Sequence, residues 1–229
     1  MKGKTLKKLG IAIVIIGGIV CMWPSITNEI TGKEMKSKIE KFVEETSGNS
    51  NVQISTLDKM REEFEEYNKE LSTNGQKLVD AFSYQDTNID LSRYGYSENI
   101  VGYINIPNMD VVLPIYLGAT KQNLKKGATL LSQTSIPIGG NNTNSVIAAH
   151  RNMTTSKMFR NIEKLKIGDE IIITNAWEEL KYEVIQTKVI SPDNIEAILI
   201  QEGKELITLV TCHPYGRNTQ RYLVYAEKK

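Results

Sequence analysis

The stretch that decides the fold is a pair of apolar runs joined by a polar loop. It reads Ile207-Thr208-Leu209-Val210-Thr211-Cys212-His213-Pro214-Tyr215-Gly216-Arg217-Asn218-Thr219-Gln220-Arg221-Tyr222-Leu223-Val224-Tyr225. β-Branched and aromatic residues dominate both runs, whereas Pro214, Gly216 and Asn218 are typical of a turn. If the two runs pair as a hairpin, strand alternation places Cys212 and Arg221 opposite each other at its mouth.

The same pattern of strand-like runs and turn residues extends back to about residue 101. Short β-branched and aromatic runs, separated by Gly, Pro and Asn, predict strands near residues 101–106, 111–116, 128–131, 145–149, 170–174, 180–190, 206–212 and 221–226. We expect a short helix over 156–165. Eight short strands indicate a mainly β fold, either a closed barrel or a sandwich. Alternating strand and helix patterns, which would indicate a doubly wound sheet, do not occur here.

Three residues at predicted strand ends form a chemically coherent set: His150, Cys212 and Arg221. A thiol becomes a strong nucleophile as the thiolate, which a neighbouring cation promotes. A histidine can pass a proton to a leaving amine, and an arginine can stabilise the oxyanion of an acyl-transfer intermediate. The set therefore predicts a thiol acyl-transfer site.

Each of these residues also has an ordinary structural interpretation. A cysteine at a strand end is usually a small buried hydrophobe, a histidine is often structural, and an arginine is usually a surface charge. Metal binding has little support, because two histidines and one accessible cysteine give no known ligand spacing. We expect no metal and no cofactor.

A resemblance favours the catalytic interpretation. The run from Thr208 to Arg221 closely resembles the active-site signature of sortases, most of all that of class C, the pilus-assembling branch. The segments 102–107, 113–116, 135–146 and 157–159 resemble the same branch, as does the pair His150-Arg151. The resemblance covers roughly residues 100 to 226 and implies a closed eight-stranded sortase-type barrel, located outside a Gram-positive cell.

The resemblance also implies roles for individual residues. Cys212 would be the nucleophile, His150 the acid and base, and Arg221 the residue that positions substrate and oxyanion. Three further residues are expected to contact the substrate or shape its loop: Thr211, Tyr215 and Asn218. The family cleaves an LPxTG-like sorting signal between Thr and Gly through a thioester. It passes the acyl group to a pilin lysine or to the peptidoglycan precursor.

The sequence departs from the class C pattern at two places. Class C enzymes usually carry an Asp-Pro-aromatic lid over the active site, but no proline lies between Pro24 and Pro107. We therefore expect no lid of the usual form, and segment 55–82 either covers the site differently or leaves it open. In addition, Asn152 stands where the branch commonly has glycine.

The N-terminal segment is predicted to be a membrane anchor. Residues 9–28 carry no charge, and this uncharged stretch is as long as a helix that spans a bilayer. Lys2, Lys4, Lys7 and Lys8 precede it, and the positive-inside rule keeps them cytoplasmic, with the rest of the chain outside. A cleaved signal peptide and a lipoprotein attachment at Cys21 are alternatives, although the residues before Cys21 match neither pattern well.

The middle of the chain is predicted to be a helical stalk or cap. Residues 33–45 read as a helix, residues 47–51 as a break, and Ser55 with Asp58 as the start of a second helix. Its apolar stripe is expected to pack on the following domain: Leu57, Met60, Phe64, Tyr67 and Leu71. Leu78–Phe82 is expected to add another helical turn or two. The predicted organisation is thus 1–28 anchor, 29–95 cap and 96–229 catalytic barrel.

Composition limits the remaining possibilities. The chain has 229 residues and a formal net charge of +1, which argues against an extensive nucleic-acid surface. Two cysteines are too few for a disulfide framework. The predicted partners are therefore LPxTG-type surface proteins or pilins, an amine acceptor and the membrane. Pilin polymerisation, anchoring of proteins to the wall and a non-catalytic peptide-binding module remain as alternatives.

Overall fold

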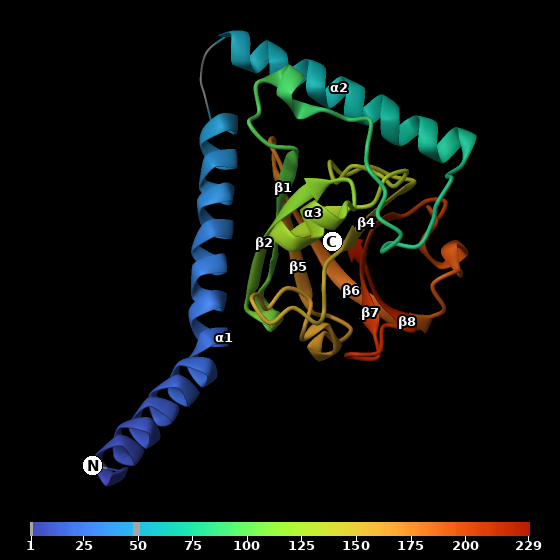
Figure 1. Ribbon diagram of the computed structural model, residues 1–229. Coiled ribbons are helices and arrows are strands. Elements are labelled where there is room, and N and C mark those ends of the chain that lie inside the picture. The colour runs from blue at the N-terminus through green and yellow to red at the C-terminus, as the bar shows by residue number, and fades with distance from the viewer. Residues whose placement is uncertain (1, 48–50) are drawn as a thin grey trace.

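The structure, a computed structural model, describes residues 2–47 and 51–229. Two long helices, α1 (Lys2–Thr46) and α2 (Asn51–Asn74), precede the barrel (Figure 1). The barrel strands are β1 (Ile100–Ile106), β2 (Val111–Leu117), β3 (Ala128–Leu130), β4 (Thr143–Ala148), β5 (Glu170–Thr174), β6 (Glu179–Ile190), β7 (Glu205–His213) and β8 (Gln220–Lys228). The short helices are η1 (Leu91–Tyr94), η2 (Pro107–Met109), α3 (Lys121–Lys126), η3 (Ile162–Lys164) and η4 (Ile195–Ile198).

The eight strands close into a barrel in the order β1-β2-β3-β4-β7-β8-β6-β5. All eight predicted strands are present, and closure decides between the two predicted architectures in favour of the barrel. The pairs β2–β3 and β4–β7 are parallel, and the others are antiparallel. The predicted helix over 156–165 was too long, because only Ile162–Lys164 forms a helical turn and the rest is turns.

Two hydrophobic clusters stabilise the barrel. The larger includes strand residues with no exposed surface, such as Ile104, Ile115 and Leu209. The smaller lies under the segment that follows α2 and includes Leu78, Leu124 and Leu223. Burying each such side chain contributes about 1.5–3 kcal/mol, so the smaller cluster gives that segment a fixed place on the barrel.

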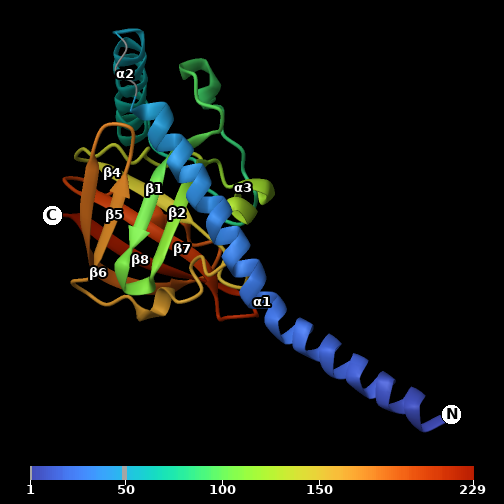
Figure 2. The same ribbon diagram turned by 90° about the vertical axis from the view of Figure 1, so that its left-hand side faces the viewer.

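Helix α1 runs unbroken from the predicted anchor into the predicted cap. It lies along β1 and β2, where Met35 and Phe42 are buried (Figure 2). An ion pair joins Lys38 to Glu98 at the same contact. Within the described residues, this is the one helix long and apolar enough to cross a membrane, with a mean hydropathy of 2.3 over its most apolar window.

Helix α2 packs its apolar stripe against the barrel, as the sequence predicted. Met60 and Phe64 are almost completely buried, and the Phe64 ring meets Trp177 edge-on at 6.0 Å. Asn68 fixes the register, because its side chain exchanges two hydrogen bonds with the backbone of Ile136, at 2.7 and 3.0 Å. The predicted start at Ser55 was wrong, since the helix begins at Asn51. Most of the predicted break lies outside the described residues.

The segment after α2 differs from the prediction in a way that matters for the site. Leu78–Phe82 is not helical but extended, with a turn at Ala81 and Phe82. Leu78 and Ala81 insert into the smaller cluster. Contacts of these two side chains with the barrel, and not a helical hydrogen-bond pattern, set the backbone of this segment. The segment crosses the end of the barrel near β4 and β7 (Figure 1).

Candidate active site

Strands β7 and β8 bring the predicted nucleophile and the predicted arginine together. Cys212 and Arg221 are directly paired in the antiparallel register of these strands. Both residues are buried, with 9% and 8% of their surfaces exposed. The hairpin predicted from the sequence therefore forms, and it places a guanidinium beside the thiol.

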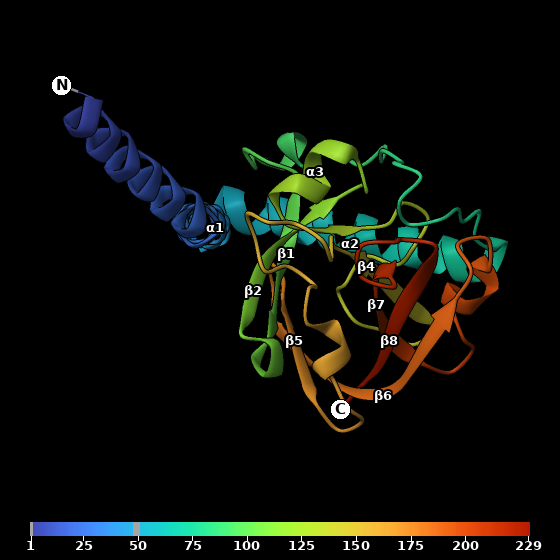
Figure 3. The same cartoon turned by 60° about the horizontal axis from the view of Figure 1, so that its bottom comes forward.

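Strand β4 supplies His150 to the same end of the barrel. It runs beside β7 (Figure 3) and parallel to it, with Ala148 opposite Val210. His150, two residues past the end of β4, therefore comes level with Cys212 near the end of β7. The Thr211 hydroxyl donates to the Ala149 carbonyl at 2.7 Å and links the two strands just before the site. A cavity of about 550 Å³ opens here and is lined by Lys125, His150, Arg151, Asn152, Met153, Thr155, Cys212 and Asn218.

The segment Asp80-Ala81-Phe82 packs against Arg221 and His150 beside this cavity, and we call it the lid. Asp80 accepts two hydrogen bonds from Arg221, Oδ1 from Nε and Oδ2 from one terminal nitrogen, each at 2.7 Å. The Phe82 ring lies 5.8 Å from the His150 ring and 5.2 Å from the Arg221 guanidinium. The lid thus contacts two of the three predicted catalytic residues.

Hydrogen bonds fasten both ends of the lid. On one side, the Gln76 amide donates to the Gln133 carbonyl at 2.9 Å and accepts from the Ile200 amide at 2.7 Å. On the other, the Ser132 hydroxyl donates to the Asp86 carbonyl at 2.7 Å. These bonds lie outside the Asp80–Phe82 contact and attach the segment to the barrel on both sides of it.

Burial keeps the catalytic pair uncharged in this closed state. It raises the pKa of the Cys212 thiol; Arg221 and Arg151 oppose the shift, and Asp80 reinforces it. Burial, followed by the nearby charge of Lys125, lowers the pKa of His150. The sequence shows a cation beside the thiol, which by itself favours the thiolate. The structure instead favours a neutral thiol and a neutral imidazole, because desolvation outweighs the cation beside the sulfur.

The three remaining predicted residues lie in different surroundings. Thr211 is completely buried, Tyr215 is 53% exposed, and Asn218 lines the cavity. Asn218 adopts a left-handed backbone with φ of 59°, and its carbonyl accepts from Arg221 at 3.1 Å. Asparagine tolerates that conformation better than most residues, so Asn218 shapes the loop that holds Arg221.

Sequence reasoning missed Asp80 and Phe82. The available signal was an Asp-x-aromatic triplet just after the predicted cap helix. It was passed over because Ala81 occupies the position where the class C pattern has proline. Ala81 is 3% exposed and packs into the smaller cluster, so burial fixes the triplet here without a proline ring.

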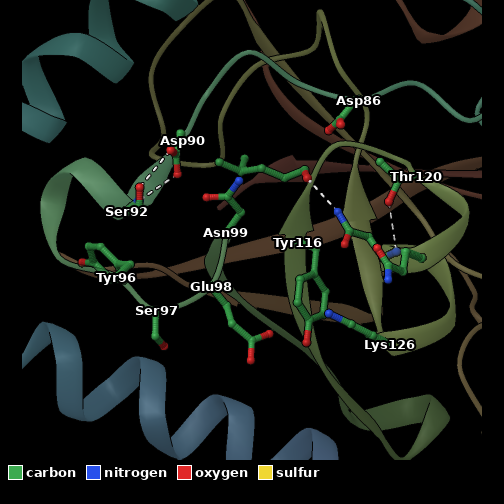
Figure 4. Close-up of a pocket in the computed structure, with 13 residues that line it drawn as sticks. Asp86, Asp90, Ser92, Tyr96, Ser97, Glu98, Asn99, Tyr116, Thr120 and Lys126 are labelled. Atoms are coloured by element: carbon green, nitrogen blue, oxygen red, sulfur yellow. Dashed lines mark hydrogen bonds between the residues drawn. The ribbon is translucent and has the colours of Figure 1, made fainter.

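A second cavity, of about 370 Å³, is lined by residues between 86 and 99, by the end of β2 and by part of α3 (Figure 4). Its polar side chains are largely used within the fold, as Asp90 bonds to Ser92, and Thr120 caps α3 through Asn123. In the described part of the chain, no group of three or more His, Cys, Asp and Glu side chains is placed to hold a metal ion.

A buried thiol between a histidine and an arginine, at the mouth of a closed eight-stranded barrel, defines a thiol acyl-transfer enzyme. A family model, the Sortase domain, matches residues 104–229. The match covers more than half of the chain, which therefore belongs to the sortase family of cysteine transpeptidases.

Individual relatives agree with this assignment. The solved structure "Sortase C1 of GBS Pilus Island 1" is similar, with a TM-score of 0.76 and 31% identity over 85% of this chain and 92% of that one. "Sortase A" of Listeria monocytogenes is 29% identical, over 96% of this chain and 90% of its own length. "Sortase D" of Bacillus subtilis is 29% identical, but the match spans 63% of that protein and 56% of this chain.

Proposed function

We propose that this chain is a membrane-anchored transpeptidase that cleaves an LPxTG-like sorting signal between Thr and Gly and polymerises pilins. The observation that carries the proposal is the pairing of Cys212 with Arg221 across β7 and β8, with His150 at the end of β4. Two further observations favour the pilus-type role. One is the lid over the site, and the other is the similarity to a structure whose title names a pilus island.

The first half of the reaction forms a thioester. As substrate enters, the Cys212 thiol transfers its proton to His150, and the sulfur attacks the threonine carbonyl carbon. Arg221 donates hydrogen bonds to the oxygen that becomes negative. His150 then gives its proton to the nitrogen of glycine as the peptide bond breaks. The products are an acyl group on Cys212 and a free glycine amine.

The second half transfers the acyl group. An acceptor amine loses a proton to His150 and attacks the thioester carbonyl, while Arg221 again stabilises the oxyanion. The carbon–sulfur bond breaks, and the sulfur regains a proton from His150. A lysine side chain of a pilin is the proposed acceptor. The alternative acceptor is the peptidoglycan precursor, which would make the product a wall-anchored protein.

The lid is proposed to open before either half of the reaction can take place. Arg221 cannot donate fully to an oxyanion while Asp80 occupies its Nε and one terminal nitrogen. Phe82 lies against His150, where the peptide must pass. Substrate binding therefore requires the Asp80–Phe82 segment to move. Tyr215 and Asn218 are proposed to border the peptide, and Thr211 to align the strands beneath it.

The anchor is proposed to cross the membrane once. Four lysines precede the apolar segment, and the positive-inside rule assigns that end to the cytoplasm. The barrel then lies outside the cell, where sorting signals emerge. We retain the organisation of anchor 1–28, cap 29–95 and barrel 96–229 as a functional division, although α1 continues from the first part into the second.

The test uses the full chain in detergent and a fluorogenic LPxTG-type peptide, with and without a lysine-containing pilin domain. Mass spectrometry would look for an acyl adduct on Cys212. The proposal expects an adduct that amine resolves faster than water, and none in Cys212→Ala. Cys21→Ser is the matched control and should behave like wild type. No adduct on any motif, even with the lid disrupted by Asp80→Ala, would refute catalysis and leave a peptide-binding module.

A further inference from the structure

A second arginine, Arg151, is buried next to the catalytic pair and plays no part in the mechanism above. Only 5% of its surface is exposed, although it carries a charge. One terminal nitrogen contacts Glu163 at 2.6 Å, and the other contacts Nδ1 of His213 at 3.0 Å. Because a buried charge is costly unless it is well bonded, these two contacts fix the guanidinium in place.

The three residues of this cluster come from three segments that meet at the site. Arg151 directly follows His150, and His213 directly follows Cys212. Glu163 lies in η3, at the end of the loop that begins with His150. The backbone of His150 is tied to the same loop, since its carbonyl accepts from the Phe159 amide at 3.1 Å. The cluster therefore joins the neighbours of both catalytic residues.

In the contact between Arg151 and His213, the role of Nδ1 as donor or acceptor depends on where the imidazole carries its proton. Arginine can only donate, so a hydrogen bond between the two requires Nδ1 of His213 to accept, with the imidazole neutral and its proton on Nε2. The same Nδ1 lies 3.2 Å from the other Glu163 oxygen. A protonated His213 would donate from Nδ1 to Glu163 and repel Arg151. The other group facing His213 is the Tyr222 ring of β8, at 5.8 Å between centroids.

We propose that Arg151 is a positioning residue for the His150–Cys212 pair, and that neutral His213 and Glu163 together hold it in place. Protonation of His213 removes the acceptor and loosens the link between the ends of β4 and β7. The kinetic part of this inference rests on the proposed function. Arg151 also favours the thiolate of Cys212, so loss of its position would slow reactions of the thiol.

The decisive variants are His213→Asn and His213→Leu, because the asparagine and leucine side chains have nearly the same size and branched shape. Asparagine places an oxygen acceptor near the position of Nδ1 that cannot be protonated at mild pH, whereas leucine offers none. We expect His213→Asn to keep kcat within about twofold at pH 7.5, because its amide oxygen can still accept from Arg151. His213→Leu should lower kcat about tenfold at every pH, with KM nearly unchanged. Arg217→Gln, in the same loop, is the control.

Two readouts need no substrate and separate this inference from the proposed function. The chain has two histidines, so ¹⁵N labelling gives two ring patterns, and His213→Asn assigns them. Neutral His213 should carry its proton on Nε2. Iodoacetamide should modify Cys212 more slowly in His213→Leu than in His213→Asn. A proton on Nδ1 of neutral His213, or equal kcat and labelling rates in the two variants, would overturn the inference. If the enzyme turns over no peptide, the tautomer and labelling results still decide it.

Discussion

Asp80 and Arg221 form a two-point ion pair at the mouth of the barrel, with both carboxylate oxygens bonded to the guanidinium at 2.7 Å. The two residues lie 141 positions apart in the chain, so the pair exists only in the folded protein. Bidentate carboxylate–arginine pairs are among the stronger hydrogen-bonded contacts in proteins. The closed state is therefore held by the group that the acyl transfer needs.

Replacing Asp80 should open the site. Asp80→Asn removes the charge that pairs with Arg221 and that raises the pKa of Cys212. Because removal of a negative charge favours the thiolate, the pKa of Cys212 should fall, and the pH midpoint of iodoacetamide labelling should move down. Peptide hydrolysis should rise several-fold. Val79→Ala, on the same segment, is the control, and an unchanged midpoint in Asp80→Asn would contradict a closed lid.

Arginine geometry, not charge alone, should matter at Arg221. Its guanidinium bonds to Asp80 and to the carbonyls of Asn218 and Gln220. A lysine keeps the charge but has no planar fork. Arg221→Lys should therefore lower kcat by about 10²-fold, the size of effect seen when one oxyanion donor is lost. Steady-state kinetics on the fluorogenic peptide would check this, and a change confined to KM would argue for substrate binding alone.

The positive charge of Lys125 should influence the pKa of His150. Lys125 lines the catalytic cavity, and its charge lowers the pKa of His150 after the larger effect of burial. Lys125→Gln removes a positive charge that disfavours the imidazolium, so the pKa of His150 should rise. An NMR titration of the ring would measure the shift. Lys126→Gln is a matched control, because Lys126 lies on the same helix over the Tyr116 ring and should leave His150 unchanged.

Helix α2 should be an integral part of the fold. Phe64 is 2% exposed and packs against Trp177 and the barrel core. Phe64→Ala should lower the free energy of unfolding by about 3–5 kcal/mol, the usual effect of removing a buried aromatic ring. Chemical denaturation would measure the change. Glu62→Ala, on the exposed side of the helix, should stay close to wild type. A small effect of Phe64→Ala would mean that α2 detaches easily from the barrel.

The strands and the pairing of Cys212 with Arg221 could be predicted because their signals are local. Alternation along 207–212 and 222–225, with a turn between them, predicts the hairpin that pairs Cys212 with Arg221. The apolar stripe of α2 predicts its buried side in the same way. Helix limits were less predictable. Ser55 and Leu78–Phe82 carried local helix signals, but α2 begins at Asn51, and the segment after it is held by contacts with distant residues.

The sequence by itself determined the eight strands and the apolar N-terminal helix, since each depends on periodicity or composition, and its motifs indicated His150, Cys212 and Arg221 as the expected catalytic set. Only the tertiary structure decided that the barrel closes, that Asp80 and Phe82 contact Arg221 and His150, and that burial raises the pKa of the thiol and lowers the pKa of the imidazole. These properties depend on which segments meet in space and on how much water they exclude. Burial around Cys212 outweighs the adjacent arginine, and residue types alone give no measure of burial.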